Sequence, residues 1–357
     1  MKKILCIDGG GARGIYAATV IMKIEEKYNI KFSEFFDVFY GVSTGSLIAS
    51  MLYLGYSGKE ICENYKKYSN LIFTDSASYD VFDTGALKMI VTDILKGKKI
   101  ERKDKEVYVF TYNIIKSKAE IVNLSEVNET GEYILASCAA PGFFNPVEIN
   151  NDKFIDGSIL ARNPSIYAFN NELSKGVKVK DMSFMSIGCI QGNLDKSIAQ
   201  DFILNFKKLL GIGNVLKKFD KKLNMLYMLE KTLYHAIDSS IDVNDELLER
   251  IFEKEGKYLK QDFKTKEYTS INKMPPTLFA ASMRDFKNKL YSEKYDEFFI
   301  EKTMTDKFKE YIFGKKQVEL SNEIWEEEKV KVEEKNEIVN EKQNHKIIEI
   351  IKNYRER

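Results

Sequence analysis

The segment that decides the fold begins at residue 4 and reads Ile4-Leu5-Cys6-Ile7-Asp8-Gly9-Gly10-Gly11-Ala12-Arg13-Gly14. A short apolar run that ends at an aspartate and three glycines predicts a buried strand followed by a tight turn. Directly after this segment, apolar residues recur at helical spacing from Ile15 to Ile24. The spacing predicts a helix, and a strand that leads into a helix through a glycine turn is typical of α/β domains.

The same pattern then repeats along the chain. Phe35–Tyr40 is predicted to be a second strand, stopped by Gly41, and Leu47–Leu54 a buried helix. Strands that are joined by helices run parallel, so the fold class we expect is α/β with a mostly parallel central sheet. Further elements are expected as strands at Val107–Tyr112, Ala119–Leu124, Lys153–Ile155 and Met182–Ile187, and as a helix at Tyr133–Ala140.

The second half of the chain has a different character. From about Ser197 onward, lysine and glutamate become frequent, and helix-spaced apolar residues occur in Leu223–Ile237 and Glu246–Phe252. We therefore predict one domain over residues 1–310, with a core at 1–190 and a helical part at 191–310. Residues 311–357 are predicted to form a charged helical tail, which is either exposed to solvent or reaches a partner.

Composition excludes several classes of protein. The chain has 55 Lys and Arg against 54 Asp and Glu, a formal charge of +1, so no global attraction to a nucleic acid polymer is expected. The four cysteines form no C-x-x-C pair, which argues against a zinc site and a disulfide framework and for a reducing cytoplasm. No apolar run is long enough for a signal peptide or a membrane span. We expect a cytoplasmic protein that reaches any membrane from its inner face.

The glycine-rich turn is a candidate anion site. Glycines let a ligand approach the backbone amides closely, and the helix that follows contributes unpaired N–H groups and a partial positive charge. The anion is either a phosphate or an oxyanion formed during acyl transfer. Gly9-x-Gly11-x-x-Gly14 also fits the dinucleotide-binding pattern, so a nucleotide-binding module is the alternative function. That alternative requires an acidic residue at the end of the second strand, where Tyr40-Gly41 stands instead.

A second motif supplies a nucleophile. Gly41-Val42-Ser43-Thr44-Gly45 places G-x-S-x-G between a predicted strand and a predicted helix, which is the context of a nucleophile elbow. Gly41 and Gly45 remove side chains that would clash in the sharp turn. Ser43 is therefore the candidate catalytic serine.

The serine needs a base, and the sequence offers two kinds. The chain order Ser43, Asp156, His235 suits a hydrolase triad, but His235 lies within a predicted helix and is expected to be structural. The second histidine, His345, lies in the charged tail. Asp156 follows the short strand Lys153–Ile155, at a strand end where α/β sheets place their active sites. A half-buried aspartate beside the serine has a raised pKa and accepts its proton.

The order of these motifs resembles that of the patatin-like phospholipases. That family has a D-G-G-G-x-R-G loop, then a G-x-S-x-G elbow, then a D-G-[GA] motif, which correspond to Asp8–Gly14, Gly41–Gly45 and Asp156-Gly157-Ser158. The resemblance is firm over residues 1–190 and loose over 190–290. Ser158 and Cys189 depart from the family's usual residues. Three further stretches also resemble it: Ala136–Phe144, Asn163-Pro164 and Ser186–Gly188.

The resemblance implies a three-layer α/β/α fold and a Ser43–Asp156 dyad without histidine, metal or cofactor. It implies that the oxyanion is held by the glycine loop, in particular by amides around Gly10, Gly11 and Ala12, and that membrane phospholipids are the substrate. Arg13 would either fix the loop or bind a phosphate head group. The full loop consists of Gly9, Gly10, Gly11, Ala12, Arg13 and Gly14.

A narrower resemblance concerns regulation. The chain is similar to the patatin-like effectors of bacterial CBASS anti-phage systems, around Leu229–Leu233 and at Tyr258-Leu259. Those effectors are activated by a cyclic oligonucleotide and degrade membrane lipids, so the resemblance implies such an activator and a role in anti-phage defence. The sequence names no nucleotide-binding residue, and it does not decide the lipid head group, the acyl position or whether the chain forms a homo-oligomer.

Overall fold

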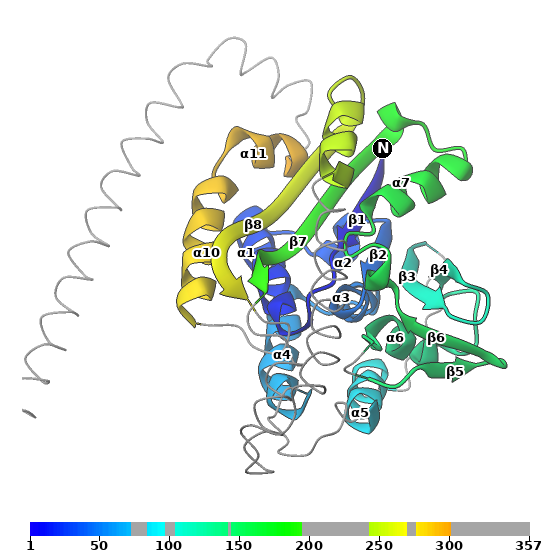
Figure 1. The fold of residues 1–357 in the computed structure, drawn as a ribbon. Helices are drawn as coiled ribbons and strands as arrows, with labels where there is room; N and C mark the ends of the chain where they lie inside the picture. Colours follow the sequence, from blue (N-terminus) through cyan, green and yellow to red (C-terminus); the bar gives the residue numbers. More distant parts are fainter. Residues whose placement is uncertain (73–83, 97–103, 142–143, 195–242, 270–275, 301–357) are drawn as a thin grey trace, which may run out of the picture. The chain divides into compact units, whose positions relative to one another are not determined.

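A computed structural model describes residues 1–72, 84–96, 104–141, 144–194, 243–269 and 276–300 (Figure 1). The chain divides into two compact units, Met1–Phe299 and Ile300–Arg357. The first unit contains Ser43, Asp156 and the glycine loop. Both histidines, the predicted helix at 223–237 and the predicted tail at 311–357 lie outside the described residues.

The strands of the first unit form one central sheet. Within the described residues the sheet has eight strands in the order β5-β6-β3-β2-β1-β7-β8, with β4 paired to β3 outside this path. The four pairings that join β3, β2, β1, β7 and β8 are parallel, and those of β3–β4, β3–β6 and β5–β6 are antiparallel. The mostly parallel sheet predicted from the sequence is thus confirmed. The strands are β1 (Lys2–Ile7), β2 (Val38–Val42), β3 (Glu106–Asn113), β4 (Lys118–Asn123), β5 (Val147–Ile149), β6 (Asp152–Asp156), β7 (Met182–Leu194) and β8 (Lys257–Thr269).

Helices cover both faces of this sheet (Figure 1). Successive strand residues face opposite sides, so Leu5 and Ile7 enter a large core, while Ile4 and Cys6 enter a smaller one. The smaller core lies beneath α7 (Ser165–Ser174) and a helix at residues 243–252. The large core packs against α1 (Gly14–Tyr28), α2 (Phe32–Phe35), α3 (Thr44–Tyr53), α4 (Gly58–Ile72), α5 (Thr84–Leu95), α6 (Thr130–Cys138), α10 (Pro276–Leu290) and α11 (Glu293–Phe299).

The strand register brings the candidate site residues to one edge of the sheet. Ile7 of β1 lies in register with Gly41 of β2 and with Ile187 of β7, so the glycine loop and Ser43 leave the sheet side by side. Asp156 ends β6 opposite Thr111 of β3, the neighbour of β2. Open α/β sheets bind ligands at this edge, beyond the carboxyl ends of their parallel strands.

The second predicted strand is wrong in its first half. The chain forms the short helix α2 at Phe32–Phe35, and β2 begins only at Val38. The rings of Phe32 and Phe35 contact the ring of Phe299 in α11, at centroid distances of 5.9 and 5.3 Å. From sequence alone, a run of aromatic residues is as compatible with a strand as with a helix. Here the contacts with Phe299 of α11, close to the end of the first unit, favour the helix.

The prediction of a helical chain over residues 191–310 is wrong for one stretch. Helices do form at residues 243–252, α10 and α11, but Lys257–Thr269 forms β8, an edge strand parallel to β7. Leu259 and Gln261 are fully buried on one face, while Tyr258 packs against the smaller core on the other. The frequent lysines of β8 concealed this two-residue alternation.

Candidate active site

Ser43 occupies a sharp turn between β2 and α3. Its backbone has φ 55° and ψ −129°, a conformation that costs a non-glycine residue on the order of 1–3 kcal/mol. The helix α3 begins at the next residue, Thr44, so its positive end lies beside the serine. These are the strand, strained turn and helix of a nucleophile elbow.

The elbow packs directly on the end of β1. A Cβ atom at Gly45 would collide with the carbonyl oxygen of Ile7 and lie 2.8 Å from that of Asp8. A Cβ atom at Gly41 would collide with the carbonyl group of Gly45. Both predicted elbow glycines are therefore needed for close backbone approach.

Side chains from α6 and α3 hold the backbone of Ser43 in place. The Ser43 amide donates to Ser137 Oγ at 3.0 Å, and Ser137 Oγ donates to the carbonyl oxygen of Phe110 at 2.8 Å. The Ser43 carbonyl oxygen accepts from Ser46 Oγ at 2.6 Å and from Cys138 Sγ at 3.1 Å. From the sequence, Ser137 and Cys138 are known only as members of a motif, because nothing in the sequence shows which backbone group they contact.

The structure brings Asp156 together with Ser43. The Ser43 side chain is close enough to the Asp156 carboxyl group to lower its pKa, and this carboxyl group accepts a hydrogen bond from the amide of Ser158 at 2.8 Å. Asp156 is only 2% exposed, whereas Ser43 is half-buried. Burial raises the pKa of Asp156 to about 6, although the Ser43 side chain and the hydrogen bond from Ser158 act in the opposite direction. Such a carboxylate is ionised near neutrality and poised to accept a proton.

The glycine loop lies against Ser43. A Cβ atom at Gly9 would stand 3.0 Å from Ser43 Cβ, so the missing side chain permits this contact. Three of the six loop amides already have partners: Gly9 donates to Arg162 O, Arg13 to Gly10 O, and Gly14 to carbonyl oxygens of the short η1 helix (Gly11–Arg13). Of the loop predicted to hold the oxyanion, residues 9–14, the amides of Gly10, Gly11 and Ala12 remain as candidate donors.

Two buried arginines fix the orientation of this loop. Arg162 Nε donates to Gly9 O at 2.8 Å, and Arg13 Nε donates to Gly10 O at 3.1 Å. A trans peptide holds its C=O and N–H in opposite directions, so these bonds also set the directions of the Gly10 and Gly11 amides. Arg13 and Arg162 are 3% and 5% exposed, and both donate to Ile190 O.

Two roles were predicted for Arg13, fixing the loop or binding a phosphate head group, and the geometry favours one of them. Its guanidinium group is enclosed and bonded to the loop backbone, which favours fixing the loop over binding a head group in solvent. Arg162 was missed from the sequence because it belongs to no motif. It lies six residues after Asp156, and the chain must fold before its contact with Gly9 exists.

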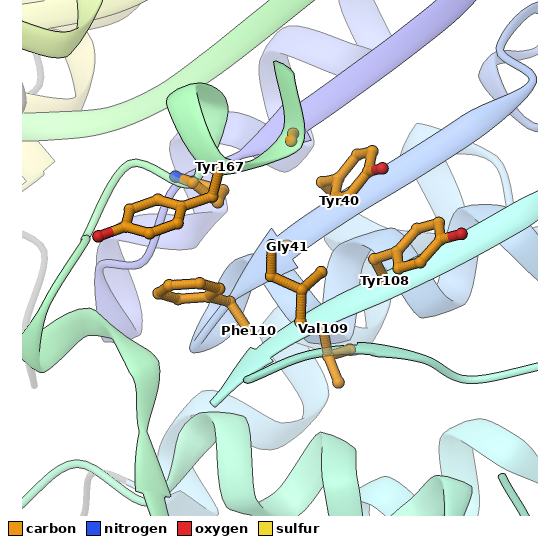
Figure 2. A pocket seen from close by; sticks show the side chains of 9 residues that line it. Tyr40, Gly41, Tyr108, Val109, Phe110 and Tyr167 are labelled. Atoms are coloured by element: carbon orange, nitrogen blue, oxygen red, sulfur yellow. The ribbon is translucent and has the colours of Figure 1, made fainter. Parts of the chain in front are cut away.

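A small hollow lies on the face of the sheet beneath α7 (Figure 2). The rings of Tyr40 and Tyr108 stack at 4.7 Å, and those of Phe110 and Tyr167 lie 4.8 Å apart. Packed rings bound the hollow, and neither catalytic candidate lines it, so we assign no acyl-chain role to it. Its lining consists of Tyr40, Gly41, Tyr108, Val109, Phe110, Ile121, Pro164, Tyr167 and Ala168.

The described residues contain neither a metal-binding cluster nor a membrane-spanning helix. Those residues contain no group of His, Cys, Asp and Glu that could hold a metal ion. Over the same ranges, no helix combines the length and apolar character that a membrane crossing requires. The four cysteines are buried and unpaired.

The comparison with known families agrees with this geometry. Residues 5–169 match the family model of the patatin-like phospholipases. The match contains the glycine loop, the elbow and Asp156, and it confirms the resemblance that the motifs indicated.

Individual relatives within the family are distant. The chain is 27% identical over 199 residues to the calcium-independent phospholipase A2-gamma of Rattus norvegicus, covering 47% of this chain and 26% of that protein. It is 26% identical over 185 residues to the cUMP-AMP-activated phospholipase of Escherichia coli, covering 46% and 57%. It is 28% identical over 200 residues to the probable lipid hydrolase 463L of Invertebrate iridescent virus 6, covering 50% and 67%. The first two alignments thus leave a large part of each relative unmatched.

Proposed function

We propose that the protein is a serine acyl hydrolase that cleaves acyl esters of membrane phospholipids. Ser43 Oγ attacks the ester carbonyl carbon while its proton passes to Asp156, and the amides of Gly10, Gly11 and Ala12 hold the oxyanion. Asp156 then protonates the leaving alcohol and activates the water that hydrolyses the acyl-enzyme. The observation that carries the proposal is the strained elbow serine beside a buried carboxyl group, that of Asp156.

The substrate class rests on the relatives. Two of them are named phospholipases and one a probable lipid hydrolase. The test is fatty-acid release from vesicles of phosphatidylethanolamine and phosphatidylglycerol, followed by mass spectrometry of the lysophospholipids. Release of fatty acid together with lysophospholipid is expected. Vesicles left intact under every condition, including those with the nucleotides described below, would refute the proposal.

The alternative of a nucleotide-binding module has less support. In the structure β2 ends at Val42, and the next residue is the elbow serine rather than the acidic residue that a ribose requires. Calorimetry that measures the binding of NAD, FAD and ATP distinguishes the nucleotide-binding module from the hydrolase. Tight binding at the glycine loop would favour the alternative over an oxyanion role.

The pH dependence of hydrolysis follows from the environment of Asp156. The base must be ionised, so kcat/KM is expected to be high above the pKa of about 6 and to fall as the pH drops through it. The nearby Cys138 thiol stays neutral, because burial and Asp156 raise its pKa above its ordinary value. Initial rates measured with a soluble ester such as p-nitrophenyl butyrate provide the profile. A level profile between about pH 5 and pH 8 would contradict Asp156 as the base.

We also propose that a cyclic oligonucleotide activates the enzyme, in keeping with a role in anti-phage defence. The support is the similarity to the cUMP-AMP-activated phospholipase of Escherichia coli. Fatty-acid release should rise about tenfold or more when one member of a panel of cyclic di- and trinucleotides, cUMP-AMP included, is added. Full activity without nucleotide, unchanged by every member of the panel, would remove this part of the proposal. The cytoplasmic location and homo-oligomerisation stay predictions.

A further inference from the structure

A cluster of buried charges lies directly beneath the glycine loop. The Nζ atom of Lys260 in β8 lies 3.5 Å from Asp8 Oδ2, 3.1 Å from Asp245 Oδ2 and 3.2 Å from Ser186 Oγ. The Lys260 side chain is 7% exposed and that of Asp8 1%. Asp8 connects the end of β1 to Gly9, the first residue of the glycine loop, so the cluster contacts the chain just before the loop.

The strand register explains how these residues meet. Cys6 of β1, Ser186 of β7 and Lys260 of β8 lie side by side across the sheet. They therefore share a face, and Asp8, two residues after Cys6, continues it. Asp245 reaches the same place from the helix at residues 243–252. Its position is fixed because its Oδ1 accepts from Asn163 Nδ2 at 2.7 Å and from the Tyr258 hydroxyl at 3.2 Å.

Buried charges of this kind are tolerated only in mutual contact. Burial lowers the pKa of Lys260, but the carboxylates of Asp8, Asp245 and Asp262 outweigh this and raise it above its ordinary value. Burial raises the pKa of Asp8 to about 7, with Asp245 and Asp262 adding to the rise and Lys260 and Arg162 opposing it. Among the described residues, Asp8 Oδ1 has no hydrogen-bond partner. The Asp8 carboxyl group thus depends on the ammonium group of Lys260.

The position of Asp8 affects both the nucleophile elbow and the glycine loop. A Cβ atom at Gly45 would lie 2.8 Å from the Asp8 carbonyl oxygen, so the elbow packs directly against Asp8. Its amide donates to Ile187 O at 3.0 Å, and the next amide, that of Gly9, donates to Arg162 O at 2.9 Å. A shift of Asp8 would move the loop amides relative to Ser43.

We propose that Lys260, oriented by Asp245, is a positioning residue for ester hydrolysis, because its ammonium group fixes Asp8 and with it the start of the oxyanion loop. The inference rests on the proposed function. It extends the site beyond residues 5–169, the part that matches the family model, to β8 and the helix at 243–252. The second half of the chain thereby supports the catalytic geometry.

The test removes the positive charge of Lys260 and keeps a side chain of similar length. Lys260→Met leaves Asp8 and Asp245 unpaired and lowers stability, so the double variant Lys260→Met/Asp245→Asn is made as well. The asparagine Oδ1 can still accept from Asn163 and Tyr258, and the net charge of the cluster is unchanged. Lys257→Met is the matched control, because Lys257 lies on the same strand but donates from the surface to Glu297 O at 2.7 Å. Full chains are compared with p-nitrophenyl butyrate, with the activating nucleotide present if one is found.

Rates are expressed per serine that reacts to completion with a fluorophosphonate, which counts correctly folded sites. We expect both Lys260 variants to lose about tenfold to a hundredfold in kcat with KM nearly unchanged, since misplacing reacting groups by about 1 Å has effects of this size. The control should match the wild type. A double variant with wild-type kcat per labelled serine would overturn the inference while leaving the proposed function intact. A wild type that neither hydrolyses ester nor is labelled at Ser43 would overturn the proposed function and the inference with it.

Discussion

Replacing Ser43 with alanine should lower fatty-acid release by about a thousandfold or more, to the level of vesicles without enzyme. Losses of this size follow when a catalytic nucleophile is removed from a serine hydrolase. The methyl group of alanine cannot attack an ester carbonyl. The fold should survive, because the Ser43 backbone bonds to Ser137, Ser46 and Cys138 do not involve the deleted oxygen.

A second serine of the same helix provides the control for this prediction. Ser50 is fully buried in α3 and donates from Oγ to Ser46 O at 2.7 Å. Ser50→Ala deletes the same atom type two turns away from the elbow, so its activity should stay within about threefold of the wild type. Comparable release by Ser43→Ala and Ser50→Ala would show that Ser43 is not the nucleophile.

Asp156→Asn is the second change with a large expected effect. Asparagine keeps the shape of the side chain but cannot take up the Ser43 proton, so kcat should fall by about a hundredfold to ten-thousandfold. The residual rate should lose the dependence on a group with a pKa of about 6. Steady-state kinetics with p-nitrophenyl butyrate measure both effects.

The matched control for Asp156 lies on the same strand. Asp152 begins β6 and pairs with Lys116 at the surface, so Asp152→Asn should retain activity. His235→Ala separates the dyad from the triad that the chain order allows. It should retain activity as well, and a folded but inactive His235→Ala would assign the base role to the histidine.

The sequence was sufficient to predict the sharp turn at Ser43, the candidate nucleophile, because its signal is local. The glycines around Ser43 and the apolar runs on either side of them specify a strand, a turn and a helix within a few residues. The alternation of β1 and β2 with helices likewise specified the parallel sheet, since the chain must cross over between parallel strands. Interactions between neighbouring residues decide both features.

The rest of the site depends on contacts between distant segments. Asp156 reaches Ser43 because β6 lies antiparallel to β3, and a lone Asp-Gly pair does not predict that pairing. In the sequence, nothing separates Arg162, Lys260 and Asp245 from ordinary surface residues, and only their burial in the folded chain shows that they belong to the site's surroundings. The strand β8 was missed for a related reason, because its frequent lysines placed it in the predicted helical part at 191–310, whereas Lys260 is buried in contact with two carboxylates.

The central claim is that Ser43, activated by Asp156, is the nucleophile of an acyl hydrolase, and titration with a fluorophosphonate tests it most directly. The extent of labelling at each serine is measured by peptide mass spectrometry, and fatty-acid release is measured on the same samples. The account predicts that the phosphonyl group appears on Ser43 and that release falls in proportion to the labelled fraction. Release that persists after Ser43 is fully labelled, or that stops while Ser43 is unmodified, would contradict it.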